Sequence, residues 1–243
     1  MKLIRPDWSL PDSITAFATT RMGGVSLPPW ASLNLGDHVG DQPGAVAANR
    51  QQLQQSLGNA RPQWLSQVHG VRVVEARADG RVQEADASWS DTPGVVCTVL
   101  TADCLPVLFA DPEGRRVAAA HAGWRGLLNG VLEATLACFD QPERVQVWLG
   151  PAIGPLAFEV GPEVRAAFCE QMPAAETAFV PSPLHTGRWL ADLYQLAWQR
   201  LTRAGVSAIS GGEYCTFTQQ DLFFSYRRDG VTGRMASLIW LSE

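Results

Sequence analysis

Residues 95–109 read VVCTVLTADCLPVLF, which are two apolar runs separated by a short polar segment. The runs Val95–Leu100 and Leu105–Phe109 have the length and the β-branched and aromatic content of buried strands. The segment between them places the thiol of Cys104 in a loop at a strand end, where α/β sheets usually build their sites. This stretch therefore predicts both the core of the fold and one chemically reactive side chain.

The rest of the chain alternates between strand-like and helix-like patterns from end to end. Further strands are predicted at Ile14–Thr20, Val71–Val74, Val117–Ala120, Val145–Leu149 and Ser237–Leu241. Helices are predicted at Ala45–Leu57, Leu127–Phe139, Pro162–Glu170 and Asp192–Ala204. Because no linker, repeat or change of composition divides residues 1–243, we expect a single domain of mixed α/β (α+β) class.

The composition is that of an ordinary globular protein. Of the 243 residues, 46% are hydrophobic and 18% are charged, and the formal net charge of −5 favours neither nucleic acid nor an anionic membrane surface. No run approaches the roughly 18 apolar residues of a membrane span, and the first residues lack the apolar stretch of a signal peptide. We therefore expect a cytoplasmic protein that binds neither nucleic acid nor membrane.

The cysteines point to the same compartment. There are five, without any Cys-x-x-Cys pair, which fits a reducing environment better than a disulfide framework. Cys97 and Cys138 lie within apolar runs, where cysteine usually acts as a small buried hydrophobic residue. Cys104 differs because it follows its apolar run.

His69, Cys104 and His121 each lie at or just past a predicted strand end. A thiolate and two imidazoles are good zinc ligands, and catalytic zinc typically has three protein ligands and an open fourth position. Three other interpretations stay open: ordinary loop and core residues, a Cys104 nucleophile activated by His121, and a copper site. A multicopper oxidase needs more imidazoles than the four histidines of this chain provide.

Ordered motifs over nearly the whole chain resemble the YfiH-like family, also called laccase-domain or multicopper polyphenol oxidase-type proteins. The motifs are residues 20–26 (TRMGGVS), 32–36 (SLNLG), 67–70 (QVHG), 103–107 (DCLPV), 121–126 (HAGWRG), 150–155 (GPAIGP), 158–160 (FEV), 224–230 (FSYRRDG) and 232–234 (TGR).

The resemblance implies a β-sandwich-like core of mixed sheets flanked by helices, of the YfiH and CNF-like cysteine hydrolase type. It also implies a zinc ion held by His69, Cys104 and His121, which are then the catalytic residues. Family members are described as phosphorylases that split adenosine, inosine and methylthioadenosine with phosphate, and as adenosine deaminases. Other descriptions are copper-dependent polyphenol oxidase and Cys/His amide hydrolase that edits peptidoglycan precursors. The sequence carries no signal for the oligomeric state.

A purine nucleoside and phosphate would need cationic and polar contacts near the metal. Arg21, Arg125 and Arg227 lie in glycine-containing loops and suit bidentate contacts with phosphate oxygens. Asn34 is a candidate for a contact with the sugar or the base. Arg21, Arg125, Arg227 and Asn34 are the predicted substrate-binding set, and Arg228 and Arg234, which lie in similar loops, are lesser candidates.

The residue that moves protons stays open. The His-x-Glu and Pro-Cys-x-x-Cys strings of zinc nucleoside deaminases are absent, so a deaminase activity would need another arrangement. Asp103 and Glu159 are the nearest carboxylates by motif, and Asp103 could instead cap a turn or hold a ligand.

Overall fold

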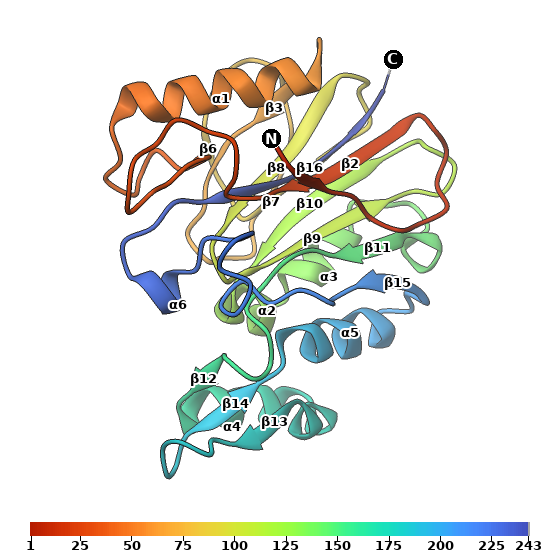
Figure 1. The fold of residues 1–243 in the computed structure, drawn as a ribbon. Helices are drawn as coiled ribbons and strands as arrows, with labels where there is room; N and C mark the ends of the chain where they lie inside the picture. The colour runs from red at the N-terminus through yellow and green to blue at the C-terminus, as the bar shows by residue number, and fades with distance from the viewer. Residues whose placement is uncertain (243) are drawn as a thin grey trace.

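Two β-sheets stacked face to face form the centre of the computed structural model, which describes residues 1–242 (Figure 1). The first sheet has the order β1 (Leu3–Ile4), β2 (Ile14–Thr19), β16 (Met235–Leu241), β8 (Val95–Thr101) and β3 (Arg61–Gln63). The second has the order β15 (Ala208–Gly211), β11 (Gln146–Leu149), β9 (Leu105–Ala110), β10 (Val117–Ala122), β7 (Ala87–Ser90) and β5 (Val73–Glu75). Both sheets are mixed, because β3–β8, β11–β15 and β5–β7 pair in parallel and the other pairs are antiparallel.

Helices cover the outer faces of both sheets. Helix α1 (Pro43–Leu57) packs on the first sheet, whereas α2 (Trp124–Asn129), α3 (Val131–Leu136) and α5 (Leu193–Arg203) pack on the second. The result is a four-layer arrangement of helix, sheet, sheet and helices, seen from top to bottom in Figure 1.

A smaller unit extends below the second sheet (Figure 1). It contains the three-stranded sheet β12 (Glu159–Val160), β14 (Trp189–Ala191) and β13 (Phe179–Pro181), together with α4 (Pro162–Gln171) and the 3₁₀ turn η2 (Pro173–Ala178). Short elements complete the chain: β4 (Leu65–Ser66), β6 (Gln83–Glu84), the 3₁₀ turn η1 (Pro142–Arg144) and α6 (Tyr226–Asp229).

The central strands are apolar on both faces because each face meets a separate core. Leu108 of β9 points between the two sheets, together with Cys97 and Ile239 of the first sheet. Its neighbour Phe109 points the other way, into the core beneath the helices. This alternation, with a period of two residues, explains why the strands read as continuous apolar runs.

The predicted strands and helices recur with ends shifted by a few residues, with one exception. The helix predicted at Leu127–Phe139 is wrong as one continuous helix, because Gly130 interrupts it between α2 and α3. Gly130 adopts a left-handed backbone with φ of 99°, and its N–H bonds to the carbonyl oxygens of Gly126 and Leu127. Glycine adopts this conformation readily, so it ends one helix and allows the next to begin at a new angle.

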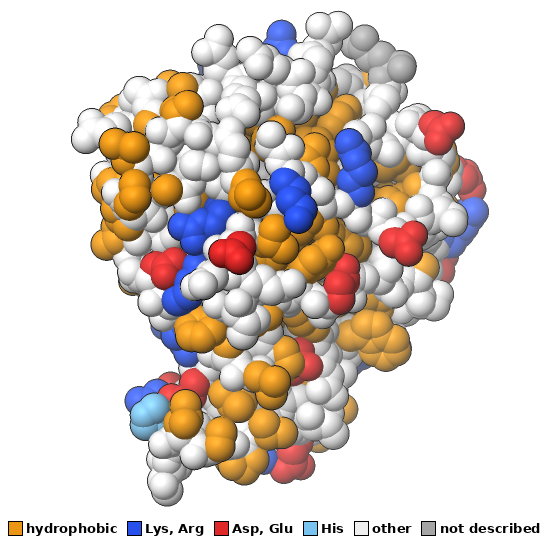
Figure 2. Space-filling model, in the orientation of Figure 1, with side chains coloured by type: hydrophobic (Ala, Val, Ile, Leu, Met, Phe, Trp, Pro, Cys, Tyr) orange, Lys and Arg blue, Asp and Glu red, His pale blue; other side chains and the backbone are white. Residues whose placement is uncertain are grey.

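The surface carries both kinds of charge. On the face drawn in Figure 2, Lys and Arg side chains are interspersed with Asp and Glu, and apolar side chains gather on the smaller unit. No helix within residues 1–242 is long and apolar enough to cross a membrane.

We expect Leu108→Ala to lower the free energy of unfolding by about 2–5 kcal/mol, because Leu108 is fully buried between the sheets and its loss leaves a cavity. Urea unfolding followed by circular dichroism measures this change. Leu184→Ala is the matched control, since Leu184 is 80% exposed. Equal effects of the two substitutions would contradict the two-sheet core.

Candidate metal centre

Three side chains from distant parts of the sequence meet where β8 and β10 end. His69 lies in the connection between β4 and β5, Cys104 lies between β8 and β9, and His121 is the penultimate residue of β10. Their ligand atoms all lie within 4.8 Å of one another, and Cys104 Sγ is 3.7 Å from His69 Nε2. The imidazole rings meet edge-on, with 4.7 Å between their centroids. The three residues proposed from the sequence as metal ligands therefore form one cluster.

The backbone around the cluster is unusual. His69 has φ of 61° and Asp103, directly before Cys104, has φ of 94°, both in the left-handed region that non-glycine residues rarely adopt. Gly123 follows β10 and is essential to the packing, because a Cβ there would lie 2.7 Å from His69 Cδ2 and 3.1 Å from Cys104 Sγ. Only a residue without a side chain lets these two ligands approach the end of β10.

Asp86 holds two of the ligands at once. Its fully buried carboxylate accepts hydrogen bonds from the backbone N–H groups of Val68, His69 and Gly70, at 2.6 to 3.2 Å. The same carboxylate accepts a hydrogen bond of 2.8 Å from Nδ1 of His121. Because Nδ1 donates its proton to Asp86, Nε2 of His121 is the nitrogen available to the cluster.

The charged forms of Cys104 and His121 stabilise each other. Burial opposes the charged form of Cys104, but the adjacent imidazoles of His121 and His69 outweigh burial and lower the pKa of the thiol to about 6. Burial also opposes the charged form of His121, but the Cys104 thiolate and the Asp86 carboxylate raise its pKa to about 9. Without a metal, the pair is therefore thiolate and imidazolium near neutral pH.

The donor set suits zinc. One thiolate and two imidazoles are typical zinc ligands, and the 3.7 Å between Cys104 Sγ and His69 Nε2 is close to the roughly 3.5 Å expected between ligands of tetrahedral zinc. A carboxylate bonded to the far nitrogen of a ligand histidine, as Asp86 is to His121, is a common feature of zinc sites. Three protein ligands leave a fourth position for water or substrate.

The other two histidines lie outside the cluster. His38 is exposed beside Asp37, with 3.5 Å between Nδ1 and Oδ1. His185 donates from Nδ1 to Oε2 of Glu159, which also accepts a hydrogen bond from Ser182. Those two hydrogen bonds lower the pKa of Glu159.

Asp103 ties the Cys104 loop to the C-terminal part of the chain. Its Oδ1 accepts a hydrogen bond of 2.7 Å from the hydroxyl of Thr216, and its Oδ2 accepts one of 2.7 Å from the backbone N–H of Arg227. The carbonyl oxygen of Asp103 also accepts a bond from Ile153 N–H. With both carboxylate oxygens bonded to the protein, Asp103 positions Cys104 and the start of α6.

Two of the predicted substrate-binding arginines are connected to the cluster. Arg125 lies four residues after His121, and the backbone N–H of Arg227 donates to Asp103, next to Cys104. Arg227 follows the first residue of α6, and its guanidinium donates to the carbonyl oxygen of Glu159 and lies 5.4 Å from the ring centre of Phe158. Arg125 is exposed at the start of α2, with its guanidinium 4.4 Å from the ring centre of Trp124. One guanidinium thus lies near Phe158, just before β12, and the other near Trp124 at the start of α2.

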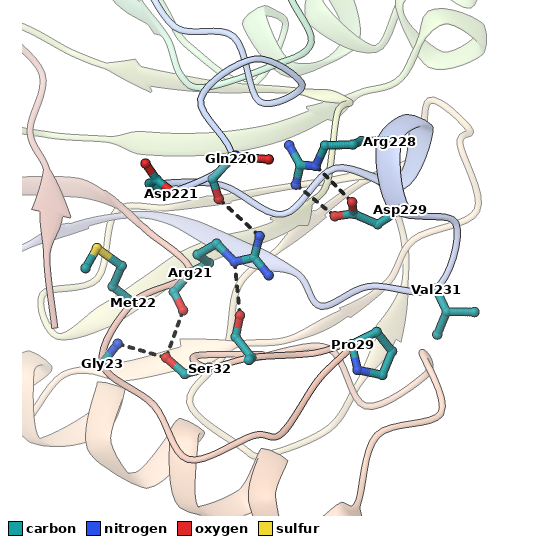
Figure 3. Close-up of a pocket in the computed structure, with 11 residues that line it drawn as sticks. Arg21, Met22, Gly23, Pro29, Ser32, Gln220, Asp221, Arg228, Asp229 and Val231 are labelled. Carbon is teal, nitrogen blue, oxygen red and sulfur yellow. Dashed lines mark hydrogen bonds and ion pairs between the residues drawn. The ribbon is translucent and has the colours of Figure 1, made fainter.

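Arg21, by contrast, lies at a separate surface pocket of about 830 Å³ (Figure 3). None of the three metal-ligand candidates lines this pocket, which is formed by Arg21, Met22, Gly23, Pro29, Ala31, Ser32, Gln220, Asp221, Arg228, Asp229 and Val231. Arg21 donates to the carbonyl oxygens of Ala31 and Gln220, at 3.0 and 3.1 Å. Two of its five N–H donors are therefore used in joining two loops.

Asn34 is fully buried, and both the nitrogen and the oxygen of its side-chain amide form hydrogen bonds. Its Nδ2 donates to the carbonyl oxygen of Gly36 and to Asp41, and its Oδ1 accepts from the N–H groups of Gly36 and Arg234. Its side chain thus fixes the backbone at Arg234.

Sequence reasoning did not identify Asp86 or Gly123 as site residues, and it ranked Arg234 below Arg21, Arg125 and Arg227. Asp86 carried no distinguishing signal, because Glu84 lies two residues before it and the strand that follows it, β7, was not predicted. The role of Gly123 depends on contacts with two other loops, which no local pattern records.

We expect Cys104 of the metal-free protein to be alkylated by iodoacetamide with half-maximal rate near pH 6, because the lowered pKa keeps the thiolate present above that pH. Peptide mass spectrometry after short exposures at pH 5 to 9 measures this. Cys97 is the internal control, since burial raises its pKa to about 12. His121→Ala should move the Cys104 midpoint upward; a midpoint between 8 and 9 in the unaltered protein would contradict the pairing.

Comparison with known proteins gives full-length matches. A family model described as multi-copper polyphenol oxidoreductase laccase matches residues 15–242. The chain is 56% identical over 244 residues to a protein of Escherichia coli named purine nucleoside phosphorylase YfiH, with 99% of each chain covered. It is 57% identical over 241 residues to a Pseudomonas aeruginosa protein named purine nucleoside phosphorylase, covering 99% of this chain and 98% of the relative.

Solved structures also match this chain over nearly its whole length. A crystal structure of a Neisseria meningitidis protein matches with a TM-score of 0.96 and 52% identity, covering all of both chains. A crystal structure of a Bacillus licheniformis protein called YfiH matches with a TM-score of 0.87 and 31% identity, over 94% of this chain and 93% of that one. The mixed sheets and flanking helices are therefore shared with solved members. The chain belongs to the YfiH-like family, the multi-copper polyphenol oxidoreductase laccase family of the matching model.

Proposed function

We propose that this protein is a zinc-dependent purine nucleoside phosphorylase with accompanying adenosine deaminase activity. The observation that carries the proposal is the His69, Cys104 and His121 cluster with its Asp86 support, in a chain 56% identical over its full length to proteins named purine nucleoside phosphorylase. The proposed substrates are adenosine, inosine and methylthioadenosine, each with phosphate.

In phosphorolysis, a phosphate oxygen forms a bond to C1′ of the ribose while the bond from C1′ to the purine nitrogen breaks. The electron pair of that bond leaves with the base, which takes up one proton, and the sugar leaves as the 1-phosphate. The reaction thus needs an anion site, a surface for the base and stabilisation of charge on the leaving group. Zinc, when bound, supplies a Lewis acid at the cluster.

Residues of the chain would supply the anion site and the surface for the base. The backbone of Arg227 is bonded to Asp103 beside Cys104, and Arg125 lies four residues after His121, so their guanidinium groups would attract phosphate toward the cluster. Trp124 is half-buried three residues after His121, and a purine that stacks on its indole ring would displace the Arg125 guanidinium, which lies 4.4 Å from the ring centre. Asp86 would hold the proton on Nδ1 of His121 and so keep Nε2 free for the metal.

Deamination of adenosine requires that water add to the purine carbon bearing the amine and that ammonia leave. The same cluster would serve this reaction, because a metal with an open position can lower the pKa of water. We assign neither Asp103 nor Glu159 as the proton carrier. Both carboxylate oxygens of Asp103 are bonded within the protein, and Glu159 is bonded to Ser182 and His185.

The test is to incubate the purified protein with inosine and with adenosine, each with and without phosphate, and to separate the products by chromatography. We expect free hypoxanthine and adenine only when phosphate is present, and inosine from adenosine in its absence. Cys104→Ala should reduce both activities at least about 100-fold, because it removes a metal ligand, whereas loss of an outer contact costs about 10- to 100-fold.

Cys169→Ala is the matched control, since Cys169 lies on α4 and belongs to a different part of the fold. The control should retain full activity. Absence of purine products from the unaltered protein with one equivalent of zinc would refute the proposed function.

A second candidate is an amide hydrolase with Cys104 as the nucleophile, favoured by the lowered pKa of this thiol and by the chain of contacts from Cys104 through His121 to Asp86. Cys104→Asp separates the two, because a carboxylate can still bind zinc but cannot replace a thiol nucleophile. Partial purine activity with retained zinc supports the metal role. Hydrolysis of a cell-wall peptide that disappears in this variant, with no purine turnover before or after, supports the nucleophile.

A further inference from the structure

Arg234 lies beside the cluster although it is far from Cys104 in sequence. It directly precedes β16, whose first residue, Met235, pairs with Thr101 at the end of β8. Asp103 and Cys104 lie two and three residues after Thr101, so the strand pairing brings Arg234 to the level of the Cys104 loop.

Two residues of the SLNLG motif fix Arg234 in place. The buried Asn34 accepts a hydrogen bond of 2.9 Å from the backbone N–H of Arg234. Gly36 leaves room for its aliphatic stem, because a Cβ at Gly36 would lie 2.8 Å from Arg234 Cγ. Both the backbone and the stem of the side chain are thus held before any ligand binds.

The guanidinium of Arg234 is only partly satisfied by the protein. Its Nη1 donates to the carbonyl oxygens of Thr232 and Gly233, both at 3.1 Å. Within residues 1–242, no hydrogen bond is formed by Nε or Nη2, and no carboxylate lies within 4.0 Å of the group. Nε and Nη2 remain accessible to solvent, so an anion can reach both nitrogens.

The surroundings of Arg234 differ from those of the neighbouring arginines. Burial lowers the pKa of Arg234, whereas the negative charges of Cys104 and Asp103 raise it, as expected of a cation next to the cluster. Arg228, six residues earlier, instead donates to three carbonyl oxygens and pairs with Asp229. Arg228 therefore has a structural role, while Arg234 keeps two donors free.

We propose that Nε and Nη2 of Arg234 bind two oxygens of the phosphate co-substrate on the open side of the His69, Cys104 and His121 cluster. This inference rests on the proposed phosphorylase function and names the residue that selects its anionic substrate. The planar fork of a guanidinium matches two phosphate oxygens, which a single ammonium cannot do equally well. Asn34 then acts through Arg234 as a positioning residue.

The experiment measures the KM for inorganic phosphate with inosine as the second substrate, and phosphate binding by isothermal titration calorimetry. Arg234→Gln should raise the KM for phosphate and the dissociation constant about 10- to 100-fold, corresponding to a loss of roughly 1.4 to 2.8 kcal/mol. Arg234→Lys should recover part of the loss. The KM for inosine should change much less than the KM for phosphate.

Arg203→Gln is the charge-matched control, because Arg203 is exposed at the end of α5. Melting temperatures of all variants identify any that fail to fold, and Arg234→Lys then serves as the test. An unchanged phosphate KM and unchanged phosphate binding in folded variants would overturn the assignment. Absence of phosphorolysis in the unaltered protein would refute the proposed function, while calorimetry with phosphate would still decide whether Arg234 binds the anion.

Discussion

The buried carboxylate of Asp86 is the interaction on which the candidate site depends. It accepts hydrogen bonds from three successive backbone N–H groups at residues 68–70 and from the ring of His121. Asp86 directly precedes β7, and the next residue, Ala87, pairs with Ala120 of β10, next to His121. Sheet pairing therefore places the carboxylate beside one ligand, and the carboxylate in turn places the loop that carries the other histidine. The left-handed backbone of His69 is maintained by this set of bonds.

The two stacked sheets supply the rigid frame around Asp86. Strands β8 and β10 are buried on both faces, so the residues at their ends have little freedom to move. Asp103 extends this frame to the C-terminal segment, because it bonds to Thr216 and to the backbone of Arg227. The pairing of β16 with β8 likewise joins Arg234 to the frame. Groups that are distant in sequence thus surround one cluster, and each is fixed by a hydrogen bond or a strand register.

The parts of this arrangement that were predictable from sequence are those that depend on local pattern. The runs before Cys104 and His121 are continuous and apolar because both faces are buried, and such runs identify strands. Asp86 was missed because its role depends on a long-range contact across β7 and β10. Arg234 was ranked below Arg21, Arg125 and Arg227 because the sequence does not reveal that β16 pairs with β8. The break at Gly130 was missed because glycine is tolerated within helices, and only packing decides whether it interrupts one. The three ligand candidates share no short spacing, so their positions at strand ends left other interpretations open, and the resemblance favoured zinc among them.

The central claim is that His69, Cys104 and His121 bind one zinc ion and leave its fourth position open. X-ray absorption at the zinc K-edge, on the protein loaded with one equivalent of zinc, tests this most directly. The account predicts one sulfur ligand at about 2.3 Å and two imidazole nitrogens at about 2.0 Å, with one further light atom. A zinc environment without sulfur, or one with two or more sulfur ligands, would contradict it.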